Sequence, residues 1–212
     1  MPWLYTPPPV FLPAWQLPKP RVEAAFSTVT SWWGRWLVLG DKLIDNSKRA
    51  AFIEYLCLPS KTSARLELAA PFTSDPADVA DQQLLEDNGW TVRDVREVCG
   101  TPQAFQDYVA CSHGEFSCIK SGYCALETGW MTERTLNYLA SGRPAIIQHT
   151  GPSAILPDAR GLFRFRTLDE AATYLDEAER NLEFHGRAAR AIIEEHFDST
   201  KVLPRVLAMV MK

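Results

Sequence analysis

The segment that decides the fold is residues 129–148, GWMTERTLNYLASGRPAIIQ. Thr132 stands where a helix N-cap belongs, because a threonine hydroxyl can accept a hydrogen bond from a backbone N–H of the first turn. Apolar residues follow at helical spacing until Gly142, and Pro144 then prevents the helix from continuing. The apolar run 145–147 is typical of a buried parallel strand. The segment therefore predicts a loop, a helix and a strand.

The start of this helix is a candidate anion site. Free N–H groups and the helix dipole both favour negative charge at a helix N-terminus, and phosphate is a common ligand there. Arg134 lies in the first turn and adds a guanidinium that can hold a diphosphate. A nucleotide-phosphate site around this helix start is the leading hypothesis.

Strand-like and helix-like stretches alternate from residue 24 onward. The expected strands cover residues 25–30, 65–70, 91–95, 115–119, 145–148 and 162–165. Helices are expected to begin at Ser47, Asp75, Thr101, Thr132, Thr167, Leu182 and Asp198. This alternation predicts the α/β class, with a single Rossmann-like parallel sheet and helices on both faces. Such sheets bind ligands beyond the carboxyl ends of their strands, where the strand order reverses.

Residues 1–20 contain seven prolines and four interspersed aromatic residues, which excludes a helix or a central strand. We expect an extended arm that lays its aromatic side chains on its own domain or on a further one. The predicted organisation is a Pro-rich arm or linker over residues 1–23 and one Rossmann-like domain over residues 24–212. Beyond the arm, the tryptophans Trp32, Trp33 and Trp36 are expected to pack rather than to stack on a base or sugar.

Composition excludes several function classes. The net charge of −4 and the pI of about 5.6 argue against nucleic-acid binding, which needs a clustered basic face. No apolar run is long enough for a transmembrane segment, and residues 1–20 do not resemble a signal peptide, so a cytoplasmic location is expected. The five cysteines are odd in number and lack CxxC spacing, which favours free thiols over a metal site. We expect no metal and no cofactor.

Several segments together carry a family resemblance: residues 112–116, 129–134, 133–144, 146–147, 161–163, 167–171 and 194–198. Their order resembles the C-terminal domain of GT-B glycosyltransferases, closest to the glycosyltransferase family 1-like, spore-maturation-type group. In that fold the C-terminal domain holds the sugar nucleotide and the N-terminal domain holds most of the acceptor site. The resemblance implies a donor-binding half, with the arm in the place of the interdomain linker. The implied partners are a nucleotide sugar and an N-terminal acceptor domain or partner subunit.

The resemblance and the expected strand ends indicate which residues contact the donor nucleotide. Lys48 follows a helix-starting serine, Lys120 follows the fourth strand, and a glycine loop follows the fifth. The candidate donor-binding residues are Gly129, Thr132, Glu133, Arg134, Asn137, Lys120, Lys48, Gly114, Glu115, Thr150 and Gly151.

The chain departs from the family at one pair of positions. Many retaining members carry two glutamates eight residues apart, and Gly129 and Asn137 stand in their places here. Asn137 can still hydrogen-bond to hydroxyls, and Glu127 or Glu133 could substitute for a carboxylate. The sequence assigns no catalytic residue.

Two functions therefore remain open. The first is glycosyl transfer from a nucleotide-diphosphate sugar when an acceptor domain completes the site. The second is a non-catalytic, degenerate nucleotide-binding or interaction domain. A dehydrogenase-type binder is disfavoured, because no Gly-x-Gly-x-x-Gly run follows the first strand.

Overall fold

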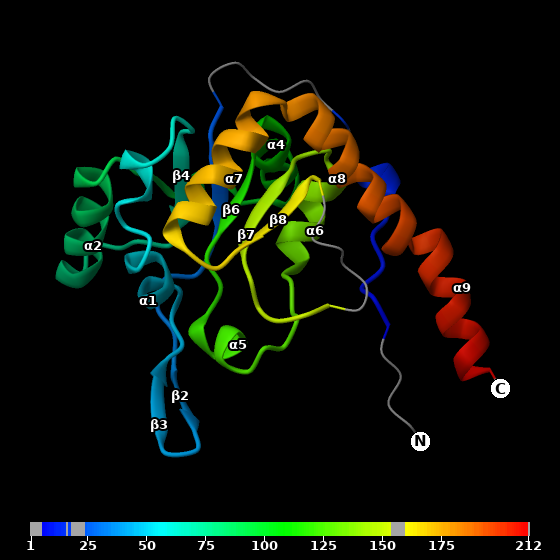
Figure 1. The fold of residues 1–212 in the computed structure, drawn as a ribbon, viewed down its shortest axis with the longest axis horizontal. Coiled ribbons are helices and arrows are strands. Elements are labelled where there is room, and N and C mark those ends of the chain that lie inside the picture. Colours follow the sequence, from blue (N-terminus) through cyan, green and yellow to red (C-terminus); the bar gives the residue numbers. More distant parts are fainter. Residues whose placement is uncertain (1–5, 16, 18–23, 154–159, 212) are drawn as a thin grey trace.

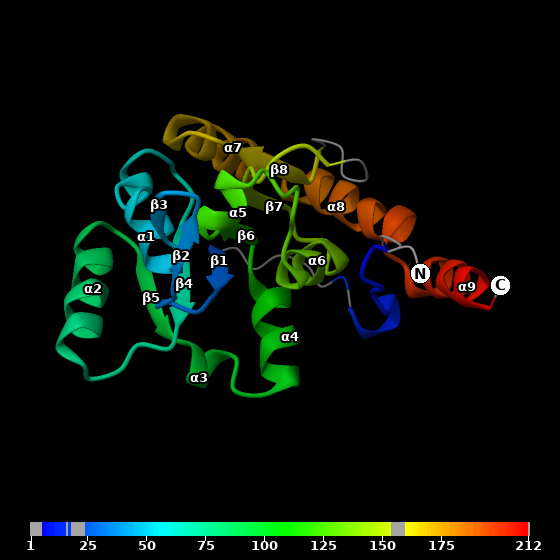
Figure 2. The same ribbon diagram turned by 90° about the horizontal axis from the view of Figure 1, so that it is seen from below.

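One six-stranded parallel sheet organises the chain. The structure is a computed structural model that describes residues 6–15, 17, 24–153 and 160–211. The strands lie in the order β5-β4-β1-β6-β7-β8; Figure 1 labels β4, β6, β7 and β8, and Figure 2 labels all six. Their bounds are β1 (Phe26–Val29), β4 (Leu66–Ala70), β5 (Thr91–Asp94), β6 (Gly114–Ser117), β7 (Ala145–Gln148) and β8 (Leu162–Phe165). The predicted α/β class and parallel sheet are confirmed.

The strand order reverses next to β1. This strand pairs in parallel with β4 on one side and with β6 on the other. The chain runs outward from β1 through β4 to β5, crosses back to β6, and runs outward again to β8. Sheets of this kind hold ligands beyond the carboxyl ends of their strands at such a switch point, which here lies between β1 and β6.

Helices cover both faces of the sheet, as predicted (Figure 2). Their bounds are α1 (Lys48–Ile53), α2 (Pro76–Asp87), α3 (Val95–Val98), α4 (Pro102–Cys111), α5 (Ser121–Ala125), α6 (Glu133–Ala140), α7 (Leu168–Arg180), α8 (Leu182–His196) and α9 (Ser199–Val210). One apolar cluster joins the sheet to α1 and α7, and a second joins it to α6 and α8. Ile146 of β7 belongs to the first cluster and Ile147 to the second, so this strand is buried on both faces.

The predicted helix starts are confirmed by their caps. Side chains of Ser47, Asp75, Thr101 and Thr132 each accept a hydrogen bond from a backbone N–H of the helix they begin. Thr167 and Glu170 form a reciprocal capping box at α7. Sequence reasoning missed the short helices α3 and α5, because four and five residues are too few to show a helical period.

Sequence reasoning also missed an antiparallel hairpin, β2 (Trp36–Leu39) and β3 (Lys42–Asp45), which projects from the domain in Figure 1. The available signal was the turn Gly40-Asp41, where Gly40 has φ +58°. The expected packing of the tryptophans is right for Trp32, but Trp33 and Trp36 are 51% and 63% exposed. Helix α5 covers one face of this hairpin, and Trp36 is exposed because it lies on the opposite face.

Part of the arm packs on its own domain. Val10 and Leu12 are buried in the second apolar cluster, whereas the aromatic Phe11 between them is 63% exposed. The described anchors of the arm are therefore two aliphatic side chains, in addition to Trp15, which packs edge-on against Phe105. The expected roles of Trp3 and Tyr5 lie outside the described residues.

None of the helices in the described ranges combines the length and apolar composition needed to cross a bilayer.

Candidate functional site

The candidate site lies where β1 and β6 end and α6 begins. Thr132 caps α6, and its Oγ1 accepts a hydrogen bond of 3.0 Å from the Thr135 backbone N–H. The Thr132 hydroxyl is thus engaged in capping the start of the helix, and Thr132 is buried. Its contribution to a ligand would be indirect, because it fixes the first turn that carries Arg134.

Lys48 places an ammonium inside the protein at this edge. It is the first residue of α1 and only 3% exposed. Its Nζ donates to the Cys118 carbonyl and lies 3.4 Å from the Ser117 Oγ, at the carboxyl end of β6. Burial lowers the pKa of Lys48 to about 8, and the nearby Arg134 charge is the next cause. Two cations therefore face the same small region.

Glu115 completes this charged cluster from the sheet. It is 1% exposed, and its Oε2 has no hydrogen-bond partner among the described residues. Burial raises the pKa of Glu115, although a hydrogen bond with Thr135 and the charges of Arg134 and Lys48 act against that rise. The buried Nε of Arg134 likewise lacks a partner within the described part of the chain. The site thus contains polar groups whose hydrogen-bonding capacity is not used internally.

Lys120 lies at the margin of the cluster, whereas Asn137 lies further along α6. Lys120 is the N-cap residue of α5, is partly buried, and is close enough for its charge to lower the pKa of Lys48. Asn137 lies one turn beyond Glu133 on α6 and is partly buried. The structure brings Lys48, Lys120, Glu115 and Arg134 together, and an anion between the cations would relieve their mutual repulsion.

Three predicted residues form a clasp between two loops beside α6. The Gly129 N–H donates to the Thr150 carbonyl at 2.7 Å, and the Thr150 hydroxyl donates to the Trp130 carbonyl at 2.7 Å. Gly151 has φ +110°, and a Cβ there would lie 2.4 Å from the Glu127 carbonyl oxygen. Glycine is therefore required at positions 129 and 151 for packing alone, because two backbone segments approach each other closely there.

Two predicted residues lie apart from the cluster. Gly114 is at the amino end of β6, where a Cβ would lie 2.5 Å from the Phe26 ring, so its small size serves packing. Glu133 is exposed and borders a different cavity. Conversely, sequence reasoning missed two residues of the cluster. Ser117 contacts Lys48, and Thr135 forms a hydrogen bond with Glu115. The end of the β6 strand was the available signal for Ser117.

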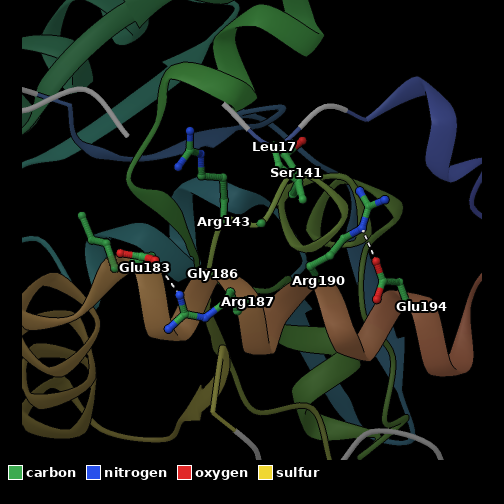
Figure 3. A pocket seen from close by; sticks show the side chains of 10 residues that line it. Leu17, Ser141, Arg143, Glu183, Gly186, Arg187, Arg190 and Glu194 are labelled. Atoms are coloured by element: carbon green, nitrogen blue, oxygen red, sulfur yellow. Dashed lines mark hydrogen bonds and ion pairs between the residues drawn. The ribbon is translucent and has the colours of Figure 1, made fainter. Parts of the chain in front are cut away.

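A cavity of about 950 Å³ lies at the opposite, amino edge of the sheet, between the end of α6 and α8 (Figure 3). Three arginines line it, but Arg187 pairs with Glu183 and Arg190 pairs with Glu194. Arg190 also donates to the carbonyls of Trp15 and Ala140. These groups hold the arm, α6 and α8 together, so we assign this cavity no ligand.

No protein-family model matches the sequence, and no curated protein matches it. Solved structures do match. Sucrose-phosphate synthase from Thermosynechococcus elongatus aligns at 10% identity with a TM-score of 0.63, covering 97% of this chain and 51% of that one. HepE from Anabaena, solved in complex with UDP, aligns at 12% identity and TM-score 0.56, covering 88% and 49%.

A third match is an isolated domain. The C-terminal domain of the group 1 glycosyl transferase LpcC from Francisella tularensis aligns at 11% identity and TM-score 0.54, covering 83% of this chain and 87% of that one. The chain spans about half or less of several longer glycosyltransferases that it matches.

At such identities the likeness shows the fold. The chain is a Rossmann-like α/β domain of the kind that is paired in GT-B enzymes. Within that class, it has the fold of the C-terminal GT-B domain, as the sequence resemblance implied.

Proposed function

We propose that this chain binds a nucleotide-diphosphate sugar at the carboxyl edge of its sheet, as the donor-binding half of a glycosyltransferase. The observation that carries the proposal is the convergence of Lys48 and Arg134 beside Glu115 at the β1–β6 switch point. The cluster sets three cations, Lys48, Arg134 and Lys120, against one carboxylate, Glu115, so its cations would attract the negative charge of a diphosphate.

The fold supports this assignment. HepE, which shares it, was solved with UDP and also with UDP-glucose. The first turn of α6 supplies backbone N–H groups that point toward the same edge, and the helix dipole adds to the positive potential there. Fixed cations and amides of this kind can stabilise a departing nucleotide diphosphate in a transfer reaction.

A second candidate function is a non-catalytic nucleotide-binding or interaction domain. The observation that favours it is the absence of carboxylates at Gly129 and Asn137, where many retaining members of the family that the sequence resembles carry glutamates. Gly129 also takes part in the backbone clasp with Thr150, so the position serves the structure. Under this reading the site binds a nucleotide but performs no transfer.

Thermal unfolding of the chain with UDP, GDP, ADP, TDP and their glucose conjugates tests nucleotide binding. A ligand specific for the native state adds about 2.7 kcal/mol of stability at a hundredfold excess over its Kd. We expect one nucleotide to raise the midpoint, and Arg134→Ala to abolish that rise. Arg187→Ala, which removes an exposed arginine from the opposite edge, is the matched control and should keep it.

The two functions separate in a second measurement. The chain is mixed with the stabilising sugar nucleotide and a panel of glycoside acceptors, and nucleotide release is followed. Release that depends on acceptor and is lost in Arg134→Ala would support glycosyl transfer. Binding without release would favour the non-catalytic domain, and the absence of any midpoint shift would contradict the donor-binding proposal.

A further inference from the structure

A cavity of about 520 Å³ lies on the other side of the α6 start, and no function has been given to it so far. Its walls come from segments that are far apart in the sequence: the arm, α5, the loop before α6, and the end of α8. The residues that matter most are Thr6, Pro8, Tyr123, Trp130, Glu133 and Phe197. We call it the arm pocket.

The wall supplied by the arm is held in place. The Val10 N–H donates to the Phe197 carbonyl at 2.7 Å, and the Ser199 N–H donates to the Val10 carbonyl at 2.9 Å. Val10 and Leu12 are also buried against α6 and α8. Thr6 and Pro8 therefore belong to a segment anchored to the same body as the rest of the pocket.

The pocket presents aromatic surface. The rings of Tyr123 and Trp130 are stacked, with centroids 4.4 Å apart and planes 13° apart. The Trp130 carbonyl accepts a hydrogen bond from the Thr150 hydroxyl, and the largely buried Leu136 and Phe197 also line the pocket. A rigid aromatic pair beside apolar side chains suits a ligand with a flat apolar face, such as a pyranose ring.

The polar groups of the pocket favour hydroxyls and disfavour anions. Glu133 is the charged residue among its described lining residues, and its carboxylate is exposed. A carboxylate accepts hydrogen bonds from hydroxyl groups, while it repels another carboxylate or a phosphate. The hydroxyls of Thr6 and Thr128 offer further donors and acceptors at the rim.

We propose that the arm pocket binds an uncharged glycoside, the acceptor for the transfer proposed above, on which this inference rests. Glu133 and Arg134 are consecutive on α6, so the cation cluster and the arm pocket lie on two sides of one helical turn. The donor's charged diphosphate and a neutral acceptor would thereby be held side by side. Part of the acceptor site is then built by this half itself, with the arm as one wall.

Ligand-observed saturation-transfer NMR tests the inference on the full chain, with and without UDP. The probes are the methyl β-glycosides of glucose, galactose and mannose, and methyl β-glucuronide as the anionic counterpart. We expect transfer to at least one neutral glycoside and little to the glucuronide. Trp130→Ala should weaken the neutral probe about tenfold, and Arg134→Ala should leave it bound.

Glu133→Lys is the second variant, since an exposed position tolerates it without loss of fold. It should bring the glucuronide signal up to that of the neutral glycosides. Absence of transfer to every glycoside, or a glucuronide signal that equals the neutral ones in the unchanged chain, would overturn the inference. If glycosides bind but no nucleotide shifts the unfolding midpoint, the donor proposal fails, while glycoside binding in the arm pocket is still supported.

Discussion

Replacing Lys48 by methionine is expected to stabilise the fold while it removes nucleotide binding. The pKa of this ammonium is lowered from 10.5 to about 8, mainly by burial. At 1.36 kcal/mol for each pKa unit, holding the charge inside costs the folded state about 3 kcal/mol below pH 8. Lost hydrogen bonds to Ser117 and the Cys118 carbonyl offset about half of the gain from its removal. The expected net gain at pH 7 is therefore about 1–2 kcal/mol.

The pH dependence gives the sharper result. Because the folded pKa lies below the unfolded one, the unfolded chain binds more protons between pH 8 and 10.5, and stability rises with pH in that window. Urea unfolding of both proteins from pH 7 to 10 isolates this residue, since other groups titrate in both. The advantage of Lys48→Met should shrink by about 2–3 kcal/mol over that range. A difference that does not change with pH would refute the reasoning.

Three further predictions concern the surroundings of the site. Gly151→Ala should lower the free energy of unfolding by about 2–4 kcal/mol, because φ +110° and the Glu127 carbonyl exclude a Cβ. Gly40→Ala, at φ +58° in open space, is the control and should lower it by about 1 kcal/mol. Equal losses in chemical unfolding would contradict the clasp. Val10→Ala should cost about 1–2 kcal/mol in the same assay, because this arm residue is buried against α6 and α8, whereas Phe11→Ala should cost less than about 0.5 kcal/mol, because Phe11 is exposed. Trp36→Ser should leave the free energy of unfolding within about 0.5 kcal/mol in the same assay, because the side chain is 63% exposed, and a large loss of stability would show that the hairpin tryptophan packs.

The elements of the fold were predictable because their signals are local. The apolar runs in β4 and β7 and the caps at Ser47, Thr132 and Thr167 act within one or two turns of chain. The hairpin β2–β3 has a local signal in the turn Gly40-Asp41, but its placement against α5 depends on contacts such as Leu37 on Gly122, which no local pattern reveals. The exposure of Trp36 follows from the same geometry.

The site was predictable only in part. The helix start with Arg134 and the residues Lys48 and Lys120 at expected element ends were found from position alone. Gly114 was grouped with them because it precedes a strand, yet it lies at the amino end, away from the cluster. The roles of Ser117 and Thr135 depend on which side chains meet across the sheet and α6, and spacing along the chain does not carry that information.

By itself, the sequence determined that the chain forms alternating strands and helices around one parallel sheet, because period, capping and breakers are properties of neighbouring residues. Only the tertiary structure decided that β1 and β6 lie side by side, and so that Lys48 reaches Ser117, 69 positions away, near Glu115 and Arg134. It also decided that the arm closes a pocket beside α6. Strand order and helix docking are set by burial summed over the whole chain, and the burial that lowers the pKa of Lys48 exists only once that packing is complete.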